Sequence, residues 1–259
     1  MSTPAVRLLV DPPLPGARNM AIDDALMEAG RAGLVTLRLY RWEPGCLSFG
    51  RNQTARGLYD GERAAALGFD VVRRPTGGRS VLHHRELTYA VAAPADWGSL
   101  GEVYLRINRA LAAGLRLLGA DVRVHEAAGG PAPRPEVRAC FRDPLPGEVT
   151  AAGRKLVGSA QWRDAGAVLQ HGSILLHNDQ ELVERLRVDG PPAAEVPAVG
   201  LAELLGAEPG AAELEDAIAA GFEESLGVAL ERGALTAREG ELAELRRARY
   251  EDPAWTWRR

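Results

Sequence analysis

Lys155 is the only lysine among the 31 basic residues of this sequence. All the others are arginine, so this position retains a compact ammonium, which can shift its pKa and exchange a proton as a guanidinium cannot. Lys155 lies in the segment Gly-Arg-Lys-Leu-Val-Gly-Ser-Ala-Gln, residues 153–161. Glycines on both sides of the lysine let the backbone approach a ligand closely. We therefore expect Lys155 to contact a reacting group, with an incidental surface lysine as the alternative.

Cys140 is the candidate nucleophile. It lies between Arg138 and Arg142, after the proline- and glycine-rich stretch 127–135, which we expect to be a loop. Cationic neighbours stabilise a thiolate. If the chain folds back, the ammonium of Lys155 can stabilise this thiolate or exchange a proton with it. The other cysteine, Cys46, begins a predicted strand and is expected to be a small core residue.

A glycine turn between two predicted strands is the third candidate site. Residues 73–83 read Arg-Arg-Pro-Thr-Gly-Gly-Arg-Ser-Val-Leu-His. Paired glycines expose backbone N–H groups and the arginines add positive charge, which suits a phosphate, a carboxylate or a thioester carbonyl. The turn matches neither the Walker loop nor the dinucleotide fingerprint, both of which open a helix. A plain hairpin turn remains the alternative.

Histidines on the predicted strands are ambiguous. His83 and His84 are adjacent, so their side chains point to opposite faces of the strand. His83 shares a face with Val81, which favours a buried histidine that lines a pocket. His171 has the same two interpretations, structural or ligand-binding.

Composition excludes several classes of protein. With 259 residues and 46% apolar content, the chain can bury a substantial core, and we expect a single domain over residues 1–259. The net charge of −4 gives no general attraction to nucleic acid or to a membrane. We expect no signal peptide and no membrane span. Two cysteines and scattered histidines predict a reducing cytoplasm and no metal site.

The order of predicted elements favours an α+β fold with a mixed, largely antiparallel sheet flanked by helices. Alternating apolar residues predict strands at 35–42, 46–50, 69–73, 80–84, 87–92, near 122, and at 149–163 and 167–176. Helical spacing predicts a first helix that starts at Met20, is capped by Asn19 and ends near Gly30 or Gly33, and further helices over 61–67, 101–118, 180–186, 212–226 and 239–250.

Taken in order, these motifs resemble the family of lipoate–protein ligases, octanoyltransferases and biotin–protein ligases. The glycine turn is similar to the family's acyl-pocket loop, and residues 153–161 and 170–175 are similar to its lysine strand and the next strand. The tail at 250–257 is similar to the family's closing segment. The sequence is closest to the cysteine octanoyltransferases of the LipM type, because Cys140 falls where these hold the acyl group. Ligases usually have a third glycine at the position of Arg79, and many have an additional C-terminal domain that we do not expect here.

The resemblance implies a biotin/lipoate ligase-like catalytic domain that transfers an octanoyl group, without a cofactor, through a thioester on Cys140. It implies acyl carrier protein as donor and a lysine of a lipoyl domain or of the glycine-cleavage H protein as acceptor. The implied catalytic residues are Cys140 and Lys155, and the implied substrate-binding residues are Arg73, Thr76, Gly77, Gly78, Arg79, His83, Gly158, Ser159, Ala160, His171 and Gly172. A LipL-type amidotransferase, an ATP-dependent lipoate ligase and a non-catalytic acyl-binding module are the alternatives.

Overall fold

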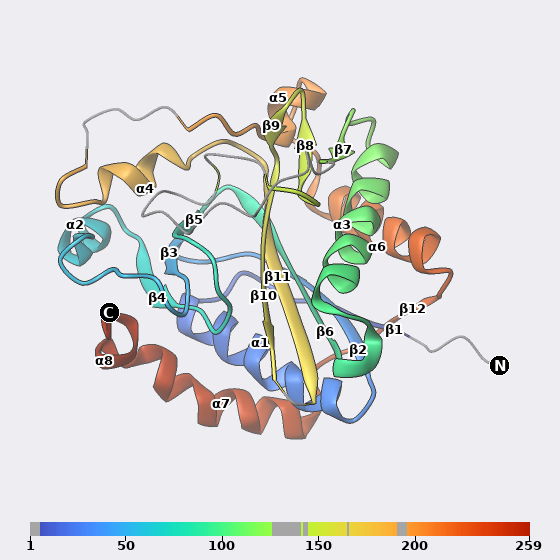
Figure 1. Cartoon of the computed structure of the whole chain (residues 1–259), viewed down its shortest axis with the longest axis horizontal. Coiled ribbons are helices and arrows are strands. Elements are labelled where there is room, and N and C mark those ends of the chain that lie inside the picture. Colours follow the sequence, from blue (N-terminus) through green and yellow to red (C-terminus); the bar gives the residue numbers. More distant parts are fainter. Residues whose placement is uncertain (1–5, 126–140, 142–144, 165, 191–195) are drawn as a thin grey trace.

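The protein is an α+β domain built on a six-stranded mixed sheet (Figure 1). The computed structural model describes residues 6–125, 141, 145–164, 166–190 and 196–259. In spatial order the sheet consists of β10 (Val157–Arg163), β11 (Ala167–Leu175), β6 (Glu86–Pro94), β2 (Val35–Tyr40), β1 (Val6–Val10) and β12 (Leu230–Arg232). The strands from β10 to β2 pair antiparallel, whereas β1 pairs parallel with both β2 and β12. This confirms the predicted mixed sheet.

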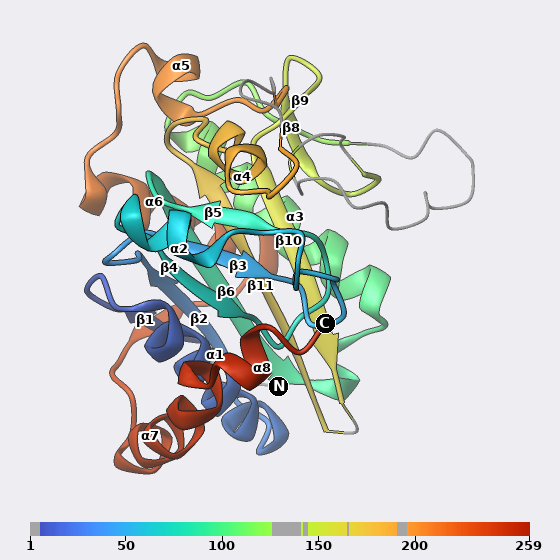
Figure 2. The ribbon, with the colours of Figure 1, turned by 90° about the vertical axis from the view of Figure 1, so that its left-hand side faces the viewer.

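Two smaller sheets extend the fold near β10. One has the order β4 (Asp70–Arg73), β3 (Cys46–Phe49) and β5 (Val81–His83), and the other has the order β7 (Arg123–Val124), β8 (Val149–Ala151) and β9 (Arg154–Lys155). Figures 1 and 2 show the β4-β3-β5 sheet beside β10 and β11, on the same side as α8 and the C-terminus.

Helices cover both faces of the large sheet. The helices of the described residues are α1 (Gly16–Arg31), α2 (Gly61–Ala66), η1 (Ala95–Trp97), α3 (Leu100–Leu117), α4 (Glu181–Arg185), α5 (Leu201–Leu205), α6 (Ala211–Leu226), α7 (Ala237–Glu251) and α8 (Pro253–Thr256). On one face α3 packs against α6, and on the other α1 packs against α7 (Figure 1).

Side chains that alternate along each strand contribute to the hydrophobic core on both faces of the large sheet. In β6, Tyr89 and Val91 pack in the cluster that contains Ile107 and Leu111 of α3, whereas Ala90 and Ala92 pack in the cluster of α1. Successive strand side chains point to opposite faces, so one strand fills both layers. The predicted helical spacing of 101–118 is confirmed, because its apolar side chains form the buried face of α3.

Two local predictions are wrong. Residues 149–163 do not form one strand but divide into β8, β9 and β10. Ala152 and Gly153 both have positive φ, 48° and 74°, and form a two-residue hairpin turn in which Ala151 pairs with Arg154. The first helix begins at Gly16 after Pro15, and the Asn19 side chain lies within it, donating to the carbonyls of Leu14 and Arg41.

Candidate active site

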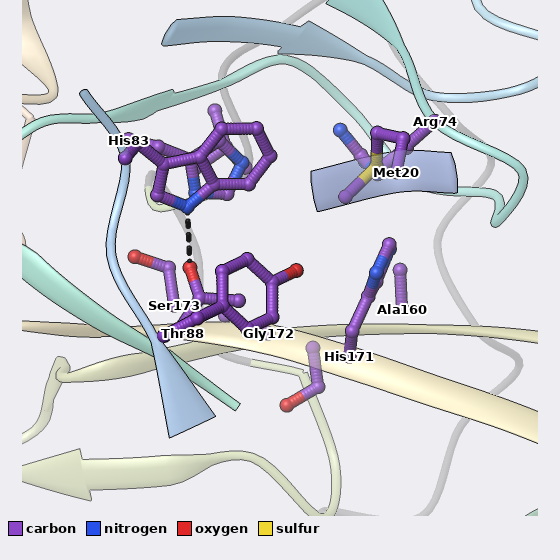
Figure 3. Close-up of a pocket in the computed structure, with 13 residues that line it drawn as sticks. Met20, Arg74, His83, Thr88, Ala160, His171, Gly172 and Ser173 are labelled. Atoms are coloured by element: carbon purple, nitrogen blue, oxygen red, sulfur yellow. Dashed lines mark hydrogen bonds between the residues drawn. The ribbon is translucent and has the colours of Figure 1, made fainter. Parts of the chain in front are cut away.

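A narrow pocket lies between the large sheet and the β4-β3-β5 sheet (Figure 3). Its lining includes Gly158, Ser159 and Ala160 of β10, His171, Gly172 and Ser173 of β11, Val81 and His83 of β5, and Met20 of α1. Of the lining residues, Ser159 and Ala160 are half-buried and the rest are buried, so the pocket opens past these two. Its volume is about 20 Å³, enough for one water molecule. An acyl chain therefore enters only if side chains such as the flexible Met20 move.

The glycine turn is fixed at this opening. The amide of Gly77 donates to the carbonyl of Gln161 at 3.4 Å. Gly78 has a φ of 87°, which favours glycine, and its carbonyl oxygen lies 1.9 Å from where a Cβ on Gly50 would be. Thr76 is buried, and its hydroxyl lies 2.6 Å from Nε2 of His171.

His171 belongs to a buried polar network that sequence reasoning missed. Its Nδ1 lies 2.8 Å from a carboxylate oxygen of Asp23, a helix residue 148 positions away in the sequence. Asp23 also accepts from Arg38 at 2.8 Å and from the hydroxyl of Tyr40 at 2.7 Å.

Both members of the histidine–aspartate pair have lowered pKa values. Burial lowers the pKa of His171 despite the nearby carboxylate, so the ring is neutral at pH 7. The pKa of Asp23 is lowered because hydrogen bonds from His171 and the charge of Arg38 together outweigh its burial. The neutral ring then donates from Nδ1 to Asp23 and accepts the Thr76 hydroxyl at Nε2. Thr76 and the start of the glycine turn are held in one position as a result.

His83 is buried and lines the pocket, whereas His84 is exposed, as the strand alternation predicts. The His83 ring stacks on Trp42 with ring centres 4.2 Å apart, and its Nε2 lies 2.8 Å from the Ser48 hydroxyl. Trp42 is in turn held by a hydrogen bond from Nε1 to Thr88, drawn in Figure 3.

The arginines of the glycine turn have different surroundings. Arg73 is fully buried and donates to the carbonyls of Gly50, Gln53 and Thr256, so it joins the turn to the C-terminal segment away from the pocket lining. Arg74 lines the pocket and donates to the carbonyls of Ser48, Gly77 and Arg79. Arg79 is half-buried beside it.

Gly158 and Gly172 bring β10 and β11 close together at the pocket wall. A Cβ on Gly172 would lie 2.3 Å from the carbonyl oxygen of Gly158 and 2.8 Å from the Tyr89 ring. The hydroxyls of Tyr89 and Ser159 are hydrogen-bonded at 2.7 Å. Only glycine therefore fits at position 172 without displacing backbone.

Lys155 is buried, on β9 at the end of the hairpin formed by β8 and β9. Its Nζ lies 2.7 Å from a carboxylate oxygen of Glu148, and the two side chains are 1% and 2% exposed. The same Nζ lies 5.3 Å from the ring centre of Phe141, the residue that follows Cys140 in the sequence. Cys140 itself lies outside the described residues. Cys46 is buried as predicted, and its burial raises the pKa of its thiol.

No group of three or more histidine, cysteine, aspartate or glutamate side chains in the described ranges is arranged to hold a metal ion. Among the helices that the structure describes, none is long and apolar enough to cross a membrane.

Known proteins resemble this chain over nearly its whole length. Residues 15–223 match the model of the lipoyl protein ligase A/B catalytic domain. A protein of Kyrpidia tusciae named octanoyltransferase LipM is 44% identical, covering 94% of this chain and 95% of its own length. A protein of the same name from Symbiobacterium thermophilum is 41% identical, covering 98% of both chains.

Solved structures show the same fold. A putative lipoate protein ligase from T. acidophilum with bound lipoic acid superposes with a TM-score of 0.79 at 24% identity, over 98% of this chain and 100% of that one. A lipoate-protein ligase A bound with ATP gives a TM-score of 0.80 at 24% identity, over 98% of both chains. Together with the family match and the full-length relatives, this shows that the chain belongs to the lipoyl protein ligase A/B catalytic domain family.

Proposed function

We propose that this protein is the octanoyltransferase of a lipoate-synthesis pathway and that it works through a thioester on Cys140. The near full-length identity of 44% to an octanoyltransferase LipM is the observation on which the activity depends. The chain is accordingly an acyltransferase. We further propose acyl carrier protein as the octanoyl donor, and a lysine of a lipoyl domain or of the glycine-cleavage H protein as the acceptor.

The proposed reaction has two acyl transfers. In the first, the Cys140 thiolate attacks the carbonyl carbon of the octanoyl thioester, the bond to the donor sulfur breaks, and the donor leaves as a thiol after taking a proton. In the second, the neutral amine of the acceptor lysine attacks the Cys140 thioester. An amide forms, the bond to Cys140 breaks, and the amine proton returns the cysteine to its thiol form. Each step exchanges one acyl bond for another, so no cofactor is consumed.

The described residues support specific roles in this reaction. The pocket between β10, β11 and β5 opens beside the glycine turn and would admit an octanoyl chain after side chains such as Met20 move. Amides of Gly78 and Gly158 are the proposed donors to the carbonyl oxygen as negative charge develops there, and the Gly77 amide can join them once it leaves the carbonyl of Gln161. Lys155 is the proposed cation beside Cys140, a role supported by the contact of its ammonium with Phe141.

Intact mass spectrometry tests the proposal. Wild-type protein incubated with octanoyl-acyl carrier protein should gain one octanoyl group that hydroxylamine removes, whereas Cys140→Ala should gain none. Adding an apo lipoyl domain should move that group to the domain's lysine without ATP. Loading from octanoyl-H protein alone would instead indicate a LipL-type amidotransferase, and release of AMP from ATP and lipoate would indicate a ligase.

A further inference from the structure

Three arginines beside the N-terminal half of the glycine turn form a cluster, defined here as Arg51, Arg249 and Arg258. The guanidinium carbons of Arg249 and Arg258 lie 3.8 and 3.9 Å from the ring centre of Trp255. Two groups this close to one ring centre must occupy its opposite faces. Trp255 is fixed in turn, because its Nε1 donates to the carbonyl of Arg73 at 2.9 Å.

This arginine cluster has no acidic partner in the part of the chain that the structure describes. No carboxylate there lies within ion-pair distance of any of the three, whereas Arg246 and Arg247, on the same helix α7 as Arg249, pair with Asp24 and with Glu244 and Glu251. Nη1 of Arg51 and Nε of Arg258 are buried without a hydrogen-bond partner.

Leaving buried donors unsatisfied and like charges adjacent is unfavourable for the folded chain. Burial and the charges of Arg51, Arg259 and Arg249 lower the pKa of Arg258. An anionic partner would relieve both costs. The cluster is therefore better suited to binding than to stabilising the fold.

The Arg51–Arg258 side of the cluster lies next to the glycine turn, near the pocket opening. The amide of Arg51 donates to the carbonyl of Thr76 at 2.7 Å, and Arg258 donates to the carbonyl of Arg51. The Arg51 guanidinium carbon lies 5.1 Å from the ring centre of Trp162 on β10. Trp162 follows the half-exposed Ala160 by two positions in the sequence. Positive charge therefore lies on one side of the opening through which a substrate enters.

The two substrates of the proposed reaction approach this opening differently. A carrier protein delivers its acyl group on a long pantetheine arm, so its folded body can stay away from the opening. An acceptor lysine has a short side chain, so the protein surface around it must come into contact with the rim. Carboxylates on that surface would pair with guanidinium groups, often bidentately, while a basic surface would be repelled.

We propose that the arginine cluster is the docking site for the acceptor protein and that it selects a target lysine surrounded by acidic side chains. This inference rests on the proposed octanoyl transfer. It assigns the acidic partner to the second half-reaction, so the two half-reactions can test it separately.

The experiment compares Arg51→Glu/Arg258→Glu with Arg238→Glu, a control on an exposed part of α7. Loading of Cys140 from octanoyl-acyl carrier protein is measured by intact mass, and transfer from loaded enzyme to an apo lipoyl domain is measured under single-turnover conditions. We expect loading within about twofold of wild type and transfer slower by about tenfold or more, with a weaker salt dependence. The control should match wild type in both steps. Arg51→Gln/Arg258→Gln should show a smaller transfer defect, and its urea midpoint checks that the fold is intact.

The outcomes separate this inference from the proposed function. A loading defect with normal transfer would assign the cluster to the donor and overturn the inference. So would normal transfer in both double variants. Replacing an acidic residue beside the acceptor's lysine with arginine should restore part of the transfer rate in the Glu variant. If wild-type protein forms no octanoyl adduct on Cys140, the proposed function fails, and the inference fails with it.

Discussion

The buried pair of Lys155 and Glu148 gives a quantitative test of how the only lysine is held. Lys155→Met leaves the Glu148 carboxylate buried without this cation, 2.7 Å from where the ammonium was. Breaking a buried ion pair by removing one partner costs about 3–5 kcal/mol. With a urea m-value of roughly 2 kcal/mol/M, this loss lowers the unfolding midpoint by about 1.5–2.5 M. Glu148→Gln should also lower the midpoint, because it removes the negative charge that lies 2.7 Å from the ammonium.

A double-mutant cycle measures the coupling directly. Lys155→Met/Glu148→Gln should be less destabilised than the sum of the single changes by about 1–3 kcal/mol, because it leaves neither charge unpaired. Additive losses, or an unchanged midpoint for Lys155→Met, would refute the view that these two charges depend on each other.

Lys155→Arg separates stability from chemistry at the same position. It retains the positive charge but changes the shape of the cation and removes its ability to exchange a proton. Octanoyl loading should fall about 100-fold, the lower end of what a positioned proton-transfer group contributes. The urea midpoint of this variant should exceed that of Lys155→Met, because the positive charge beside Glu148 is retained. Loading near the wild-type rate would remove Lys155 from the proposed mechanism.

Two further predictions concern the pocket walls. The lowered pKa of His171 means that the unfolded chain, with a histidine pKa of about 6.5, binds a proton more readily than the folded chain. The stability that His171 contributes should therefore be fully present above about pH 6.5 and be lost as the pH falls through the lower, folded pKa. Between about pH 7.5 and pH 5, the urea midpoint should fall more steeply for wild type than for His171→Gln. Parallel slopes for the two proteins would contradict this. Gly172→Ala should cost about 1–3 kcal/mol and slow octanoyl loading, because its Cβ meets the Gly158 carbonyl. The control Gly101→Ala has open space in helix α3, where alanine is favoured over glycine, so it should lower neither the stability nor the loading rate.

Much of the fold could be predicted because its signals are local. Helical spacing at Val103, Ile107, Leu111 and Leu115 reports which face is buried, whatever that face packs against. The β10–β11 hairpin likewise joins strands that are neighbours in the sequence. Pairing between distant segments leaves no such signal. The parallel pairing of β1 with β12, more than 200 residues apart, was accordingly not predicted.

The candidate site divides in the same way. Residue types alone singled out Lys155, Cys140 and the glycine turn, because a lone ammonium, a thiol between arginines and paired glycines are chemically distinctive wherever they lie. The tertiary structure decided which groups lie next to the site residues. It places Asp23 beside His171 and Glu148 beside Lys155, and it buries Arg73 against the carbonyl of Gly50. It also brought Arg51 to Arg258 across 207 positions. The sequence determines what each side chain can do. The packing of the sheets and helices determines which side chains lie next to it, and these neighbours set its charge pairing and its burial.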